Sequence, residues 1–86
     1  MAKKAATVLI VDDEPHICEL LFRWLTAEGH ECTVAFNGDM ALELLEGHEF
    51  DLMISDIMMP GMSGIDLLKI VMSRYPETAV VMDRGG

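Results

Sequence analysis

Apolar and polar positions follow one another along the chain in a way that predicts strands and helices in turn. The first apolar run, residues 8–11, is aliphatic at every position, which is typical of a strand buried on both faces. A helical pattern then opens at Pro15 and ends at Gly29, with proline in the first turn and glycine just past the last. The apolar positions of this first helix are Ile17, Leu20, Leu21, Trp24 and Leu25.

The same alternation continues through the rest of the chain. Residues 31–36 predict a second strand, Asn37-Gly38 a turn, and residues 52–54 and 79–82 a third and a fourth strand. A second helix ends near Gly47 and carries the apolar positions Ala41, Leu42 and Leu45. A third helix follows a loop of residues 56–63, closes at Tyr75-Pro76, and carries Ile65, Leu67, Leu68, Val71 and Met72.

The predicted order of elements is βαβαβαβ. Strands that alternate with helices through short links indicate parallel pairing with right-handed crossovers, so the fold class is α/β with an open, doubly wound parallel sheet. A chain of 86 residues forms one domain at most, and with 51% hydrophobic residues it can bury a core.

Composition narrows the classes of partner and location. The formal net charge of −9 argues against a nucleic-acid surface, because phosphate backbones attract clustered Lys and Arg, and only Lys3 and Lys4 adjoin. No stretch approaches the roughly 20 apolar residues that span a bilayer, and no secretory signal is recognised, so a cytoplasmic location is expected. Cys18 and Cys32 lack metal-ligand spacing and are expected to be reduced thiols, buried or partly so.

Carboxylates cluster where two of the predicted strands end. Asp12, Asp13 and Glu14 follow the first strand and Asp56 follows the third, so these side chains converge if the two strands are neighbours. Two carboxylates about 4 Å apart repel by roughly 1 kcal/mol in bulk water and about 4 kcal/mol at an effective dielectric near 20. A divalent cation relieves that repulsion, and oxygen ligands favour Mg²⁺. The alternative is that Asp13 and Glu14 simply complement the dipole of the first helix.

Residues 56–64, which read Asp-Ile-Met-Met-Pro-Gly-Met-Ser-Gly, resemble the phosphoacceptor loop of bacterial two-component response regulator receiver domains of the chemotaxis-regulator type. Asp12-Asp13 and the following Glu14-Pro15 resemble the acidic pocket of the same family. The resemblance covers residues 8–82. It implies a flavodoxin-like sheet of strand order 2-1-3-4 and a single, partial receiver domain over residues 1–86.

The resemblance also implies roles for particular residues. Asp56 is the expected acceptor of a phosphoryl group from a sensor histidine kinase or phosphotransfer protein. The expected Mg²⁺ ligands are Asp13, Asp12 acting mainly through water, Asp56, and the backbone carbonyl of Met58. The chain is then a phosphoacceptor with no turnover cycle of its own, and not an enzyme.

The end of the chain departs from the family. In receivers a Ser or Thr at the end of the fourth strand binds the phosphoryl group, and that position falls on or beside Arg84. A fifth strand ending in Lys, with its flanking helices, is not found, and Lys69 belongs to the third helix. Residues 83–86 are therefore expected to form an atypical tail. Compared with the family, the chain is expected to lack the fifth βα unit and to be truncated at its C-terminus.

Three other functions are alternatives to the phosphoacceptor role. A truncated receiver without signalling competence would act as a binding module or as a homodimer paired through the fourth-strand edge or the exposed apolar face. A flavin protein would need a phosphate-cradling loop after the first strand, where acidic residues stand. An aspartate-nucleophile phosphatase would need its two aspartates two residues apart, whereas Asp12 and Asp13 are adjacent. His16, His30 and His48 share no ligand spacing and are interpreted as surface or turn residues.

Overall fold

The computed structural model describes residues 5–83, and the seven predicted elements follow in the predicted order. The strands are β1 (Thr7–Val11), β2 (Glu31–Ala35), β3 (Leu52–Asp56) and β4 (Ala79–Asp83). The helices are α1 (Pro15–Ala27), α2 (Gly38–Gly47) and α3 (Gly64–Arg74). All strand pairs are parallel and the sheet order is β2-β1-β3-β4, which confirms the predicted fold class and strand order.

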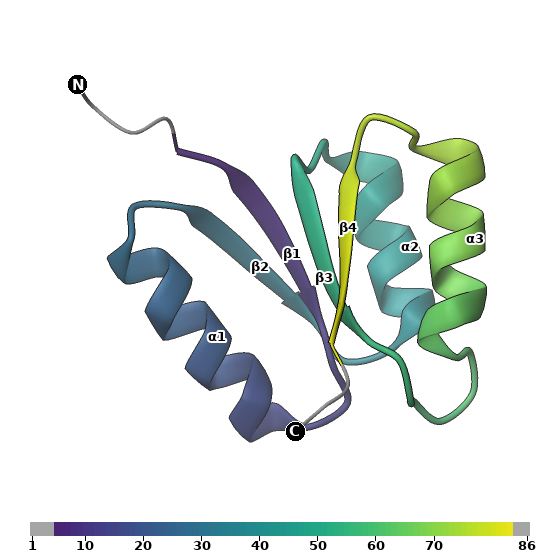
Figure 1. Ribbon diagram of the computed structural model, residues 1–86, viewed down its shortest axis with the longest axis horizontal. Coiled ribbons are helices and arrows are strands. Elements are labelled where there is room, and N and C mark those ends of the chain that lie inside the picture. Colours follow the sequence, from purple (N-terminus) through teal and green to yellow (C-terminus); the bar gives the residue numbers. More distant parts are fainter. Residues whose placement is uncertain (1–4, 84–86) are drawn as a thin grey trace.

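Helices cover both faces of the sheet: α1 lies on one face, and α2 and α3 lie on the other (Figure 1). On the α1 side, Val8 and Ile10 of β1 pack with Cys18 of α1. On the other side, Leu9 and Val11 of β1 join the larger core. The prediction that residues 8–11 form a strand buried on both faces is therefore confirmed, since all four are at most 1% exposed.

The ends of α1 follow the predicted signals. Pro15 stands in the first turn, where its missing N–H leaves no helical bond unmade. Gly29 has a φ of 98°, a conformation that favours glycine, and its N–H donates to the Thr26 carbonyl at 3.0 Å. The His30 N–H reaches back to the Leu25 carbonyl at 3.2 Å, so the reversal after α1 is held by two backbone bonds.

The start of α2 differs from the prediction. Asn37-Gly38 was expected to form a turn, but Gly38 is the first residue of the helix. Asn37 is the N-cap, and its side chain accepts a hydrogen bond from the Met40 N–H at 2.8 Å. Asn-Gly favours turns and Asn also favours helix caps, and here the cap prevails because a helix follows at once.

The apolar stripes read from the sequence are wider than the faces that the structure buries. Leu20 and Trp24 of α1 are 62% and 67% exposed, and Met72 of α3 is 64% exposed. Helix α1 packs mainly against β2 and β1. Val81 of β4, on the same side of the sheet, is consequently half exposed. Within residues 5–83, the α1 side of β4 has no helix over it.

Some predicted features lie outside the described residues or find no counterpart within them. Lys3, Lys4 and Arg84 lie outside residues 5–83, as does the predicted tail beyond Asp83. A fifth βα unit does not occur among the described residues. None of the helices in this part of the chain combines the length and hydropathy needed to cross a membrane.

Candidate functional site

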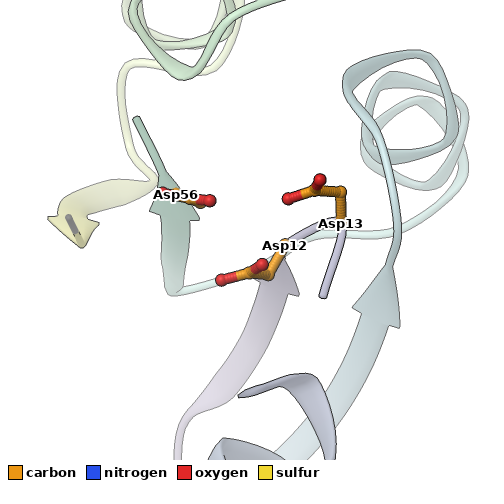
Figure 2. A group of neighbouring side chains, drawn as sticks. All are labelled: Asp12, Asp13 and Asp56. Carbon is orange, nitrogen blue, oxygen red and sulfur yellow. The ribbon is translucent and has the colours of Figure 1, made fainter. Parts of the chain in front are cut away.

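Three aspartates converge where β1 and β3 end, as the sequence predicts. The two strands are neighbours with Val11 opposite Ser55, so the residues that follow, Asp12 and Asp56, stand side by side. One carboxylate oxygen from each of Asp12, Asp13 and Asp56 lies within 4.8 Å of the other two. Figure 2 shows the side chains of Asp13 and Asp56 extending toward each other, with the Asp12 carboxylate beside them. We call these three residues the acidic pocket.

Backbone hydrogen bonds fix the two buried carboxylates. Asp12 is 2% exposed; its N–H donates to the Ala35 carbonyl at 3.1 Å, and its Oδ1 accepts from the Glu14 N–H at 2.9 Å. Asp56 is 7% exposed, and its Oδ1 accepts from the Met58 N–H at 3.3 Å. Each side chain thus bonds to the backbone two residues later, a local turn typical of aspartate. Asp13 is exposed and completes the pocket from the solvent side.

Without a bound cation, the surroundings of Asp12 disfavour its ionised form. Burial raises the pKa of Asp12 above its ordinary value of 3.8, and the negative charges of Asp56, Asp13 and Asp83 raise it further. The hydrogen bond from the Glu14 N–H opposes these effects but does not cancel them. A cation in the pocket would therefore stabilise the ionised form of Asp12.

The loop after β3 is shaped by a close approach at Gly64. The Gly64 N–H donates to the Ile57 carbonyl at 2.9 Å. A Cβ at this position would collide with the Asp56 carbonyl oxygen and with the Ile57 Cα, so only glycine fits. Ser63 then caps α3 by accepting from the Asp66 N–H at 3.1 Å. Gly64 therefore couples the start of α3 directly to the backbone of Asp56.

Two methionines of this loop have opposite environments. Met59 is 8% exposed and belongs to the core on the α2 and α3 side, whereas Met58 is 76% exposed beside the pocket. The Met58 N–H bonds to Asp56, but the ligand role of its carbonyl stays a prediction. Met58 therefore carries an exposed apolar side chain two residues after Asp56.

Two residues near the pocket were not assigned to it from the sequence. The Cys18 thiol donates to the Asp12 carbonyl at 3.2 Å, and burial raises its pKa to about 11. Cys18 and Cys32 are free thiols, buried and partly buried as expected. Asp83 was placed in the atypical tail, but it is the last residue of β4 and stands opposite Asp56 in the sheet register. The signal for Asp83 was its position at the end of an apolar run, as for Asp12 and Asp56.

The other candidate residues lie away from the acidic pocket. Glu14 contributes its backbone N–H but is not one of the three grouped carboxylates, and Lys69 is exposed on α3. Among the described residues, the group suited to a metal contains no histidine. The Arg84 position, expected to face the phosphoryl group, lies outside the described residues.

The donor set of the acidic pocket suits a hard divalent cation. All three side chains offer oxygen, and three protein carboxylates leave coordination positions for water or phosphate oxygens, as Mg²⁺ requires. His and Cys ligands, which favour Zn²⁺, are not part of the group. The residues present therefore fit Mg²⁺.

A flavodoxin-like sheet whose carboxyl edge gathers three aspartates defines a class of α/β domain with an acidic metal pocket. The family model of the response regulator receiver domain matches residues 8–83. The chain therefore belongs to the response regulator receiver family, whose members are phosphoacceptor modules and not enzymes with a turnover cycle.

Similar proteins agree with this assignment. The chain is 38% identical over 76 residues to the response regulator GtcR of Aneurinibacillus migulanus and 40% identical over 78 residues to the response regulator protein FleR of Pseudomonas aeruginosa. These matches cover 88% and 91% of the chain but only 31% and 16% of the relatives. The chain thus spans less than a third of each relative's length.

Solved receiver structures superpose closely on the chain. The response regulator TrrA of Thermotoga maritima, in complex with Mg²⁺ and BeF, has a TM-score of 0.86 at 38% identity and covers 90% of this chain and 67% of its own. The chemotaxis protein CheY4 of Vibrio cholerae also has a TM-score of 0.86, at 36% identity, with 92% and 68% covered. The chemotaxis-regulator resemblance is confirmed at the level of structure.

Proposed function

We propose that Asp56 accepts a phosphoryl group from a phosphohistidine on a sensor histidine kinase or phosphotransfer protein, in two-component signal transduction. The observation that carries the proposal is the acidic pocket: three carboxylates within 4.8 Å of one another, one of them on the phosphoacceptor loop. Mg²⁺ bound by Asp12, Asp13, Asp56 and the Met58 carbonyl would neutralise charge on the phosphoryl oxygens. We propose a cytoplasmic location for the domain.

The chemistry requires little beyond position and charge. A carboxylate oxygen of Asp56 forms a bond to phosphorus while the phosphorus–nitrogen bond of the phosphohistidine breaks, and the product is an acyl phosphate on Asp56. The imidazole of the donor leaves as the electron pair returns to its nitrogen. Asp56 keeps its orientation through the Met58 N–H, and Asp12 keeps its own through the Glu14 N–H. Gly64 holds the Asp56 backbone in place.

A likeness to TrrA supports this proposal. TrrA was crystallised in complex with Mg²⁺ and BeF, and beryllofluoride stands in for a phosphoryl group. TrrA shares 38% of its sequence with this chain over the superposed region. By analogy, we expect this acidic pocket to hold both groups.

The proposal is tested by metal binding followed by beryllofluoride. Calorimetry should detect one Mg²⁺ per chain. The Asp13→Ala, Asp56→Ala double variant should lose this binding, because the Asp12 carboxylate alone supplies too few ligands for Mg²⁺. Fluorine NMR should then detect beryllofluoride bound only when Mg²⁺ is present and Asp56 is intact. Asp39→Asn, an exposed change on α2, is the control and should bind both. Unchanged Mg²⁺ binding in the double variant contradicts the proposed site.

A second function is favoured by a separate observation, the exposed apolar surface on the α1 side. Leu20, Trp24 and Val81 are 62%, 67% and 50% exposed, and β4 pairs only with β3 among the described strands. We propose that a second copy of the chain covers this surface, with the two β4 edges paired about a two-fold axis. This arrangement leaves both acidic pockets open, because they lie at the strand ends.

The self-association proposal has its own test. Light scattering at low micromolar concentration should give a dimer mass or larger, and Val81→Lys should shift it to a monomer by placing charge in the interface. Met72→Lys, at a similarly exposed position on α3, is the matched control and should stay dimeric. A monomeric mass for the unchanged chain, with unfolding independent of concentration, contradicts the proposal. Such a dimer without phosphoryl transfer would be a binding module only.

A further inference from the structure

Three neighbouring strands end in an aspartate on the same face of the sheet. On β1, Val8 and Ile10 belong to the core on the α1 side, and because side chains alternate, Asp12 has the same parity. On β3, Ile54 packs against that same core, and Asp56 follows two residues later. The register pairs Ile54 with Val81 and Asp56 with Asp83, so Asp83 shares this face on β4.

The position of Asp83 is fixed by the strand pairing. The Ile57 N–H donates to the Asp83 carbonyl at 3.0 Å, which continues the β3–β4 ladder to the end of Asp56. Neighbouring strands lie about 4.8 Å apart, so Asp12, Asp56 and Asp83 form a row across the carboxyl edge. Asp83 is partly buried. Its negative charge also acts on Asp12, whose pKa it helps to raise.

We propose that Asp83 is a further carboxylate beside the acidic pocket, and that its charge strengthens divalent cation binding and weakens binding of the phosphoryl group. The inference rests on the proposed function and adds a specificity-determining residue to it. Asp83 is not one of the three carboxylates close enough to share an ion. It therefore acts through its charge from the next strand and not as a direct ligand.

The two effects of Asp83 have the same electrostatic cause and opposite signs. A negative charge one strand away attracts a divalent cation and repels an incoming anion. Because Asp83 is partly exposed at the end of β4, added salt should screen both effects. A neutral side chain at this position should therefore lower the affinity of the acidic pocket for a divalent cation and raise its affinity for an anion.

The test compares Asp83→Asn with the unchanged chain. Calorimetry should show Mg²⁺ binding weakened about 3- to 10-fold, as expected for loss of one nearby charge in a partly screened pocket. Fluorine NMR at saturating Mg²⁺ should show beryllofluoride binding strengthened by about 3-fold or more for the same reason. Glu46→Gln removes one charge at the far end of the sheet and should leave both values unchanged. Circular dichroism confirms that each variant is folded.

The outcomes separate this inference from the proposed function. If the unchanged chain binds no Mg²⁺, or if Asp13→Asn binds it equally well, the metal site itself fails and Asp83 has nothing to modulate. If Asp13→Asn loses Mg²⁺ while Asp83→Asn stays within about twofold of the unchanged chain on either measurement, only the role of Asp83 is overturned. Weaker beryllofluoride binding by Asp83→Asn would also overturn it.

Discussion

Replacing Asp12 by Asn should stabilise the protein when no metal is bound. Asp12 is 2% exposed and contributes one of the three carboxylate oxygens that lie within 4.8 Å of one another. Asparagine has almost the same volume and keeps an Oδ1 that can accept the Glu14 N–H bond. The substitution therefore removes a charge while leaving the local turn in place.

The magnitude follows from the spacing of the carboxylates. Two unit charges 4.8 Å apart repel by about 0.9 kcal/mol in bulk water and about 3.5 kcal/mol at an effective dielectric near 20. Asp12 is buried but Asp13 is exposed, so the effective value lies between these limits. We expect Asp12→Asn to raise the free energy of unfolding of the metal-free protein by about 1 to 3 kcal/mol at neutral pH.

The pH dependence of this effect has a definite sign. Because the pKa of Asp12 is raised in the folded state, the folded chain holds the Asp12 proton more tightly than the unfolded chain. Its contribution to stability therefore falls as pH rises from 3.8 through the raised folded pKa. Asp12→Asn should lack this fall. Mg²⁺ binding, which needs the ionised carboxylate, should weaken as pH drops through the same window.

Urea denaturation with a chelator, followed by circular dichroism at neutral and at acidic pH, measures both effects. In the presence of Mg²⁺ at a hundred times its dissociation constant, the unchanged chain should gain about 2.7 kcal/mol, and Asp12→Asn should gain less. Glu46→Gln serves as the control for net charge. A metal-free Asp12→Asn variant that is less stable than the unchanged chain at neutral pH would refute the electrostatic account of the pocket.

Three further changes test other parts of the structure. Gly64→Ala should abolish Mg²⁺ binding or destabilise the fold by several kcal/mol, because its Cβ collides with the Asp56 backbone. Calorimetry measures the Mg²⁺ binding and urea denaturation measures the stability, and no change in either would contradict the close approach. Leu67→Ala should cost about 2 to 5 kcal/mol in urea denaturation, since Leu67 is fully buried, and a loss under about 1 kcal/mol would contradict that packing. Cys18, with a pKa of about 11, should react with a disulfide reagent at mildly alkaline pH only on unfolding, whereas Cys32 should react in the folded chain; equal rates would contradict the burial of Cys18.

Much of the fold could be predicted because local signals and burial agree. Residues 8–11 are aliphatic throughout and fill both cores, so a single pattern fixed both the strand and its central place in the sheet. Pro15 and Gly29 bracket α1 for reasons of backbone geometry that require no tertiary contact. Strand order, in contrast, came from the family resemblance.

The sequence was less informative where burial depends on what packs opposite. Leu20 and Trp24 share the helical spacing of the partly buried Leu21 and Leu25, but α1 contacts mainly β2 and β1, and only one edge of its stripe is covered. Asn37-Gly38 fits a turn and a helix cap equally well, and the following residues decide between them.

Some residues in and around the acidic pocket could also be predicted from the sequence, and others could not. Asp12, Asp13 and Asp56 could be predicted because the pair Asp12-Asp13 follows one apolar run, Asp56 follows another, and parallel strands share a carboxyl edge. Asp83 ends an apolar run as well, but it was assigned to an atypical tail because it departs from the family pattern. The thiol bond from Cys18 to the Asp12 carbonyl depends on how α1 packs under the pocket, which periodicity does not specify.

The most direct test of the central claim is to locate the phosphoryl group on the chain. The protein is incubated with acetyl phosphate and Mg²⁺, the acyl phosphate is reduced with borohydride, and the modified residue is identified by mass spectrometry of peptides. Modification is expected at Asp56 alone, dependent on Mg²⁺ and absent from Asp56→Asn. Modification at another residue, or none at Asp56 when Mg²⁺ is shown to be bound, would contradict the central claim.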